Sequence, residues 1–119
     1  MAALARIRML QKVLRQKYGI MGEVAAKYLE SGARVRIGHP TRHGEVHILV
    51  YKDGARYAIE VFSEPRTVPR EVVENLLRKA KLLNAKPILV LYGDGPKLSE
   101  DVYQFCRDQG VKIRRMKAR

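Results

Sequence analysis

The chain begins with apolar and basic residues arranged at helical spacing. Over residues 3–15 an apolar residue recurs every three or four positions, which predicts an amphipathic helix. These apolar positions are Leu4, Ile7, Leu10 and Leu14. The pattern is interrupted at Tyr18-Gly19, resumes over residues 20–31 and stops at Ser31-Gly32. This part of the chain therefore forms either two helices or one kinked helix.

Three runs of alternating apolar and polar residues follow, and they predict strands. The runs cover residues 33–38, 45–51 and 56–62. Asp53-Gly54 stands between the last two runs, and this dipeptide is a strong signal for a hairpin turn. Residues 39–44 contain a proline and a glycine, so we expect a loop between the first two strands.

The second half of the chain alternates helical and strand patterns. Residues 69–83 carry a broad apolar face at helical spacing, with Thr67 as a candidate cap. Residues 86–93 form an unbroken apolar run, which is typical of a central strand covered on both faces. A helical pattern over residues 99–109 leads to a last short strand over residues 111–116.

These patterns predict one α/β domain over residues 1–119, with the element order α-β-β-β-α-β-α-β. A chain of 119 residues suits a single domain, and 46% apolar residues suffice for a core without disulfides or metals. An antiparallel meander leads into strand–helix–strand units, so we expect a mixed central sheet flanked by helices. Residues 1–18 form a basic helical stretch that precedes the main part of the domain.

The cysteine content and the hydropathy indicate where the protein works. Cys106 is the single cysteine, so a disulfide within the chain is impossible, and we expect it to act as a small apolar residue on its helix. No apolar run approaches the roughly eighteen residues of a membrane helix. The start of the chain lacks the apolar block of a secretory signal. We therefore expect a cytoplasmic protein that does not insert into membranes.

The charge is the strongest compositional signal for function. The chain has 24 Lys+Arg against 12 Asp+Glu, a formal net charge of +12. A polyanionic partner relieves the self-repulsion of such a chain, and this favours nucleic acid over a merely solvated basic surface. Both ends are basic, since neither residues 1–17 nor residues 112–119 contain an acid. The candidate phosphate-contacting residues are Arg34, Arg36, Arg42, His43, Lys52, Arg8, Lys12 and Arg15.

Face parity brings candidate chemistry together on the second and third strands. Alternation places Val46, Ile48 and Val50 on one face of their strand, and it places Glu45 and His47 on the other face. On the next strand Ala58, Glu60 and Phe62 share a face. We therefore expect Glu45, His47 and Glu60 to converge. In the purely structural alternative, Glu60 pairs with a basic residue of the first helices such as Lys27.

The run "GEVHILVYKDGARYAIEVFSEP", followed by an amphipathic helix and "AKPILVLYG", resembles the core of the PD-(D/E)xK nuclease superfamily. Within it, the chain is most similar to small archaeal Holliday junction resolvases, and the resemblance covers residues 19–116. It implies a restriction-endonuclease-like fold, a homodimer and a role in DNA recombination and repair. It also implies a metal site built around Glu60, with Glu23 contributed by the helix "GIMGEVAAKYLESG".

Two departures from the family pattern argue against cleavage. His47 stands where the family has a metal-binding aspartate, and Phe62 stands where it has a lysine. Magnesium requires hard carboxylate oxygens, so Glu60 and His47 alone would suit a softer ion such as Mn²⁺ or Zn²⁺. We interpret Glu60, Glu23 and His47 as a remnant catalytic site. We therefore expect a protein that binds DNA, branched DNA included, without a cofactor.

Two further readings remain open. In the first, the protein is an active endonuclease that uses Mg²⁺ or Mn²⁺, and other side chains replace the missing groups. The replacement carboxylate would come from Glu45 or Glu64, and the replacement lysine from Lys79 or Lys27. In the second, the old fold serves as an assembly module that binds a partner protein. The three histidines His39, His43 and His47 are four residues apart but do not lie on a helix, so they are a weak metal signal.

Overall fold

The computed structural model describes residues 2–118, and only the backbone of residues 2 and 3. Met1 and the basic Arg119 therefore lie outside the described part of the domain expected over residues 1–119. Within the described range the elements are α1 (Ala2–Tyr18), α2 (Ile20–Glu30), β1 (Arg34–Thr41), β2 (Gly44–Lys52), β3 (Ala55–Phe62), α3 (Arg70–Leu82), β4 (Lys86–Tyr92), α4 (Glu100–Gln109) and β5 (Lys112–Met116).

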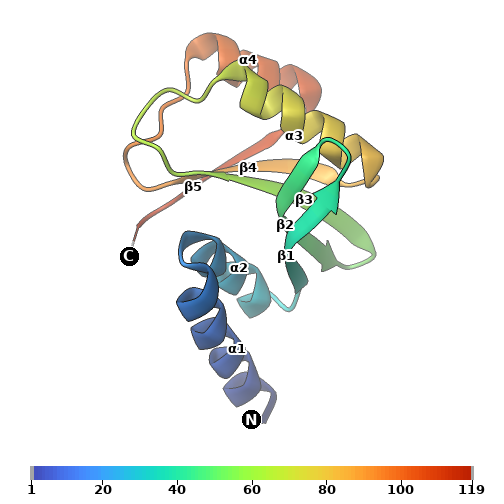
Figure 1. Cartoon of the computed structure of the whole chain (residues 1–119), viewed down its shortest axis with the longest axis vertical. Coiled ribbons are helices and arrows are strands. Elements are labelled where there is room, and N and C mark those ends of the chain that lie inside the picture. The colour runs from blue at the N-terminus through green and yellow to red at the C-terminus, as the bar shows by residue number, and fades with distance from the viewer. Residues whose placement is uncertain (1, 119) are drawn as a thin grey trace.

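The five strands form one mixed sheet in the order β1-β2-β3-β4-β5. Strands β1, β2 and β3 pair antiparallel, whereas β3, β4 and β5 run parallel. Helices α1 and α2 lie on one face of the sheet, and α3 and α4 cover the other face (Figure 1). The predicted α/β class, the element order and the mixed sheet are thus confirmed. None of the described helices is long and apolar enough to cross a membrane.

The first helical segment consists of two helices, because Gly19 adopts a positive φ of 57° between them. Helix α1 packs back against α2 at close range. A Cβ atom added to Gly22 would stand 1.9 Å from the carbonyl oxygen of Leu14. The buried side chain of Gln11 donates to the carbonyl of Ala26 at 2.8 Å across the same contact. Only glycine permits this approach of the two backbones.

The prediction of a loop over residues 39–44 is wrong for residues 39–41, which belong to a strand. Strand β1 continues to Thr41, and only Arg42 and His43 form the turn into β2. The Thr41 hydroxyl accepts from the His43 amide and donates to the carbonyl of Gly44, which fixes this turn. Because β1 is an edge strand, Pro40 fits in it without leaving a ladder hydrogen bond unmade.

The two other turn and cap predictions have opposite outcomes. The Asp53-Gly54 hairpin is confirmed, with φ of 51° and 78° at its two residues, as a type I′ turn requires. The Thr67 cap is wrong. Pro69 occupies the N-cap of α3 without a side-chain hydrogen bond, and Thr67 instead pairs with Lys97 in an isolated bridge.

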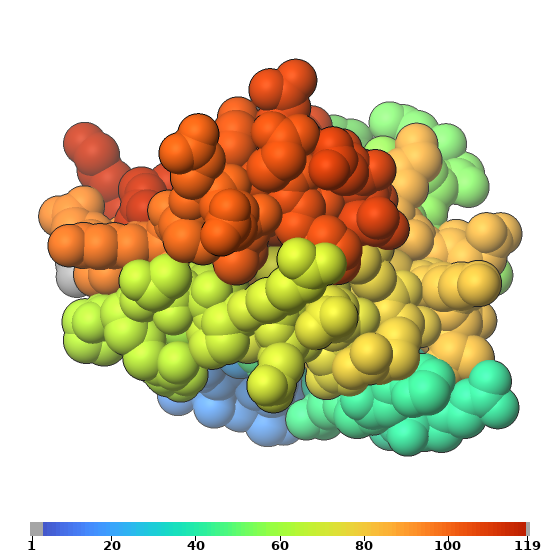
Figure 2. Space-filling view, turned by 90° about the horizontal axis from the view of Figure 1, so that it is seen from above, coloured from blue at the N-terminus to red at the C-terminus, as the bar shows by residue number. Residues whose placement is uncertain are grey.

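The sheet separates two hydrophobic clusters. The cluster under α3 and α4 includes Val46, Ala58, Phe62, Val73, Leu76, Leu89 and Cys106. The cluster under α2 includes Val24, Ile48, Val50, Ile59, Val61, Ile88 and Val90. Figure 2 looks onto the first of these faces and shows α3 and α4 side by side across it. Cys106 is fully buried there, as expected, and burial raises the pKa of its thiol.

The prediction that Val46, Ile48 and Val50 share a face is wrong, because Val46 belongs to the opposite cluster from the other two. The alternation breaks at His47, whose partner position on β1 is near Gly38. Gly38 has a φ of 75°, which is unusual inside a strand and typical of a bulge. Regular pairing of β2 with β3 also ends here, at Ile48 and Ile59.

Candidate functional site

Strands β2 and β3 separate where their regular pairing ends, and a side chain fills the gap. The backbone N–H of Val61 would otherwise donate to β2. It donates instead to Nδ1 of His47, at 3.0 Å. The imidazole therefore takes the place of a backbone carbonyl in the ladder. Since Nδ1 accepts this hydrogen bond, a neutral His47 carries its proton on Nε2.

Helix α3 contributes a lysine to the same place. Lys79 Nζ donates to the carbonyl oxygen of Glu45 at 2.8 Å and lies 3.3 Å from Oε1 of Glu60. The other carboxylate oxygen of Glu60, Oε2, lies 3.4 Å from Nε2 of His47. We call the group formed by Glu45, His47, Glu60 and Lys79 the notch.

Burial makes the contacts in the notch strong. The side chain of Lys79 is 5% exposed and that of Glu60 is 15% exposed, while His47 is 28% exposed. A lysine ammonium this deep requires a compensating charge, and the Glu60 carboxylate supplies it. The acid in the middle of β3 is thus balanced by Lys79 on one oxygen and faces the imidazole with the other.

The structure therefore brings together some of the expected residues and separates others. His47 and Glu60 meet, as face parity predicts. The pairing of Glu60 with Lys27 is wrong, because Lys79 occupies that role and Lys27 lines a cavity under α2 on the other face. Lys79, considered as a replacement lysine, does reach Glu60. Its signal in the sequence is its place beside Leu76 and Ala80 on the apolar stripe of α3.

Glu23 is separated from the notch by the sheet. It accepts a hydrogen bond from the Tyr92 hydroxyl, and Tyr92 packs in the cluster under α2. Glu60 reaches α3 on the opposite face. As an acid in the first turn of α2, Glu23 also stabilises the positive end of that helix. The expected grouping of Glu23 with Glu60 and His47 is therefore not present.

The two candidate replacement acids also lie elsewhere. Only the backbone carbonyl of Glu45 enters the notch, and its exposed side chain lies against Gly38. Glu64 is exposed and pairs with Arg66 on the connection after β3. Phe62, at the family lysine position, is 6% exposed and belongs to the core beneath α3 and α4.

This arrangement does not fit a magnesium ion. Among residues 2–118 the structure groups no three His, Cys, Asp or Glu side chains that could hold a metal, so His39, His43 and His47 do not cluster either. The notch offers one carboxylate, and that carboxylate already faces an ammonium. The imidazole nitrogen Nδ1 is engaged by Val61. We therefore derive no metal-dependent step from the notch.

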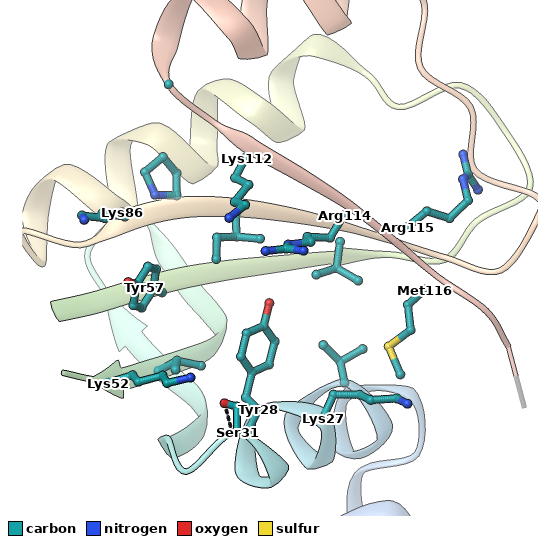
Figure 3. A pocket seen from close by; sticks show the side chains of 16 residues that line it. Lys27, Tyr28, Ser31, Lys52, Tyr57, Lys86, Lys112, Arg114, Arg115 and Met116 are labelled. Atoms are coloured by element: carbon teal, nitrogen blue, oxygen red, sulfur yellow. Dashed lines mark hydrogen bonds between the residues drawn. The ribbon is translucent and has the colours of Figure 1, made fainter.

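A second feature lies on the opposite face of the sheet. A cavity of about 700 Å³ opens between α2 and strands β2, β3, β4 and β5 (Figure 3). We call it the basic groove. The basic side chains that line it are Lys27, Lys52, Lys86, Lys112, Arg114 and Arg115, and no acidic residue is among the described lining residues.

The other basic candidates are spread over the surface. Arg34 and Arg36 are exposed on the edge strand β1, and Arg42 and His43 are exposed in the β1–β2 turn. Lys52 is the one member of the candidate list that lines the basic groove. On α1, Arg8 and Lys12 are exposed, whereas Arg15 is half-buried, and its Nε hydrogen-bonds to none of the described residues.

Sequence reasoning missed the groove itself. The strand predicted over residues 111–116 is confirmed as β5, but the sequence did not indicate that this basic strand lies on an edge of the sheet. The segment "KIRRM" carries the relevant signal, because alternation places Lys112 and Arg114 on one face with Met116 and leaves Ile113 on the other. Only the tertiary arrangement brings these residues near Lys27 of α2.

Comparison with solved structures finds proteins of the same fold, and one of them is an endonuclease. A repair endonuclease from Pyrococcus abyssi matches with a TM-score of 0.61 and 23% identity, over 76% of this chain and 41% of that one. The protein of unknown function AF1548 matches with a TM-score of 0.61 and 16% identity, over 77% and 54% of the two chains. Pyrococcus furiosus SfsA, solved in complex with Ca²⁺, matches with a TM-score of 0.57 and 15% identity, over 82% and 53%.

These likenesses show a common fold. The chain spans about half the length of the solved structures it matches. No protein-family model matches the sequence, and no curated protein matches it either. The restriction-endonuclease-like topology inferred from the sequence agrees with the fold shared with the repair endonuclease.

Proposed function

We propose that this protein binds nucleic acid through its phosphates and that its nuclease-like fold no longer cleaves it. The observation that carries the proposal is the state of the notch. The one acid of the family pattern that remains on β3, Glu60, is neutralised by the buried Lys79 rather than kept for a metal. The preferred partner is DNA, including branched DNA, as the resemblance implies.

The charge distribution supports the binding half of the proposal. The chain of 119 residues carries a formal net charge of +12. The basic groove concentrates part of this charge, because no acidic residue is among its described lining residues. Basic residues that line up on one surface release counterions from a phosphate backbone when they bind it. Arg34, Arg36, Arg42, His43, Lys52 and the two basic ends are the positioning residues that we propose, with little reading of base sequence.

A combined binding and cleavage assay tests the proposal. Purified protein is incubated with labelled four-way junctions, duplexes and single strands, each with Mg²⁺ or Mn²⁺. We expect retarded complexes and intact strands. Cleavage that is present in the wild type and absent from Glu60→Ala would contradict the proposal, since it would assign a reaction to the notch.

The proximity of Lys79 to Glu60 supports a second candidate, an endonuclease in which Lys79 replaces the family lysine. Its Nζ lies 3.3 Å from the Glu60 carboxylate, so a cation stands beside the acid, as the resemblance to the nuclease family implies. In this second candidate, Mg²⁺ or Mn²⁺ would have to displace the ammonium from Glu60. Loss of cleavage in both Glu60→Ala and Lys79→Met, with retained binding, would establish it.

We also propose the homodimer that the resemblance implies, with α1 as the contact. Among the described elements, α2 is the one against which α1 packs closely. Several large apolar side chains of α1 are therefore left exposed. These are Leu4, Met9, Leu10 and Val13. Met9, Leu10 and Val13 lie on one side of the helix at helical spacing, and an exposed apolar patch of this kind is a common basis for association between copies.

A further inference from the structure

The basic groove is open because the helices of its face do not cover the whole sheet. Helix α2 packs mainly against β1 and β2, and it covers β3, β4 and β5 less closely. The edge strand β5 turns Lys112 and Arg114 toward this part of the face. The result is a concave surface. One of its walls is formed by strand β5 and the opposite wall by the side of α2 (Figure 3).

The cations of the groove are available to an incoming ligand. Lys27, Lys112 and Arg114 are exposed, and none of them forms an ion pair with another residue of the described chain. Arg115 differs, because its guanidinium donates to the carbonyls of Gly93 and Pro96. It thereby holds the loop between β4 and α4. Like charges gathered in a concavity without acids attract a polyanion.

The lining of the groove favours unpaired bases. Val50, Ile88 and Val90 lie beneath its floor and are at most 5% exposed, so its aromatic lining offers the apolar surface that a ligand can reach. Two aromatic rings form this lining, Tyr28 and Tyr57, and Figure 3 shows Tyr28 extending from α2 toward Arg114. A duplex presents phosphates and sugars and keeps its base faces stacked, so it cannot use such a lining. A single strand can place bases against it.

The proximity of Arg114 to the Tyr28 hydroxyl brings the aromatic and the basic part of the groove together. Burial raises the pKa of the Tyr28 hydroxyl, and the nearby Arg114 guanidinium partly offsets that rise. The hydroxyl therefore stays a protonated donor at neutral pH beside a permanent cation. This pair offers a phosphate two donors and offers a base one aromatic face.

We propose that the basic groove binds a single strand of nucleic acid, on the face of the sheet opposite the notch. Lys27, Lys112 and Arg114 hold its phosphates, and Tyr28 and Tyr57 contact its bases. This inference rests on the proposed function and names the form of nucleic acid and the surface that binds it.

The test measures binding of a labelled oligothymidylate by fluorescence anisotropy at several salt concentrations. The variant Lys112→Gln/Arg114→Gln removes two exposed cations of the groove. The control Arg78→Gln/Arg107→Gln removes two exposed cations from α3 and α4 on the other face. Thermal unfolding of each protein confirms that it is folded, which these exposed positions lead us to expect.

The groove variant is expected to bind the single strand about tenfold more weakly and to lower the salt slope by about 1.4, or about 0.7 for each lost phosphate contact. The control is expected to stay close to the wild type. If the wild type binds the single strand and the two variants bind it with equal affinity, the assignment of the binding site to the groove is overturned. A wild type that binds no nucleic acid would overturn the proposed function instead.

A duplex of the same length and the variant Tyr28→Leu test the single-strand form. The duplex is expected to bind more weakly than the single strand at the same salt. Tyr28→Leu is expected to weaken single-strand binding about tenfold through lost stacking, with its salt slope unchanged. Tighter binding of the duplex, or no effect of Tyr28→Leu on affinity, would overturn the single-strand assignment.

Discussion

Lys79 decides the chemistry of the notch at the scale of single residues. On an apolar stripe of α3, a lysine extends its aliphatic stem along the core and brings its ammonium to Glu45 and Glu60. Phe62, at the family lysine position, fills the core instead. The sequence could place Lys79 on the buried face of its helix. It could not tell whether the ammonium reaches Glu60, because that depends on how far β2 separates from β3.

Replacing Lys79 with methionine is expected to destabilise the fold by about 2–3 kcal/mol. The change keeps most of the apolar contact but leaves Glu60 without its counter-charge and the Glu45 carbonyl without its donor. Urea unfolding measures the effect, with Lys81→Met as the control at an exposed position of the same helix. The double variant Glu60→Gln/Lys79→Met should recover part of the loss. A single variant as stable as the wild type would show that the pair contributes nothing.

His47 is expected to contribute through its Nδ1 acceptor. His47→Ala leaves the Val61 N–H without its partner and should cost about 1–2 kcal/mol. In His47→Asn the side-chain oxygen stands close to the position of Nδ1, so most of that stability should return. The free energies of unfolding of both variants check this. Equal destabilisation by alanine and asparagine would contradict a role as a backbone substitute.

The elements follow the sequence wherever short-range chemistry sets them. Gly19 separates α1 from α2, Asp53-Gly54 turns the hairpin, and the Ser99 side chain caps α4 by accepting from the Val102 amide. The sequence failed where tertiary structure overrides the local pattern. The break at His47 moves Val46 to the opposite face, and nothing in the alternating run "EVHILVY" marks it.

The contact between α1 and α2 is expected to depend on Gly22. In Gly22→Ala the new methyl group meets the backbone of α1 near Leu14, which flexible side chains cannot relieve. We expect a loss of about 3 kcal/mol, or release of α1 seen as fast amide exchange over residues 3–15. Glu30→Ala, at an exposed position of the same helix, is the control and should be close to neutral. Slow exchange of α1 in Gly22→Ala would show that the close approach is not required.

Association through α1 is a separate prediction. Met9→Gln/Val13→Gln removes two apolar side chains that are 71% and 49% exposed, so it should leave the fold intact and turn a dimer into a monomer. Light scattering coupled to size-exclusion chromatography measures the mass. Lys12→Gln, an exposed change on the same helix, should leave the dimer unchanged. A wild type that is monomeric at high concentration would rule out the dimer.

At the scale of the whole molecule, the two faces of the sheet have different character. The face covered by α3 and α4 holds the larger core and ends in the notch. The face that α2 half covers carries the basic groove. Composition favours a polyanionic partner, and motif order predicted the fold. Neither could locate the groove, because its walls come from segments as distant as Lys27 and Arg114.

The salt dependence of DNA binding tests the central claim most directly. Affinity of the wild type for a labelled single strand is measured over a series of salt concentrations, and log K is plotted against log salt. Binding through three or more phosphates predicts a straight line with a slope of about −2 or steeper. A slope near zero would contradict phosphate-driven binding, and with it the role proposed for this basic chain.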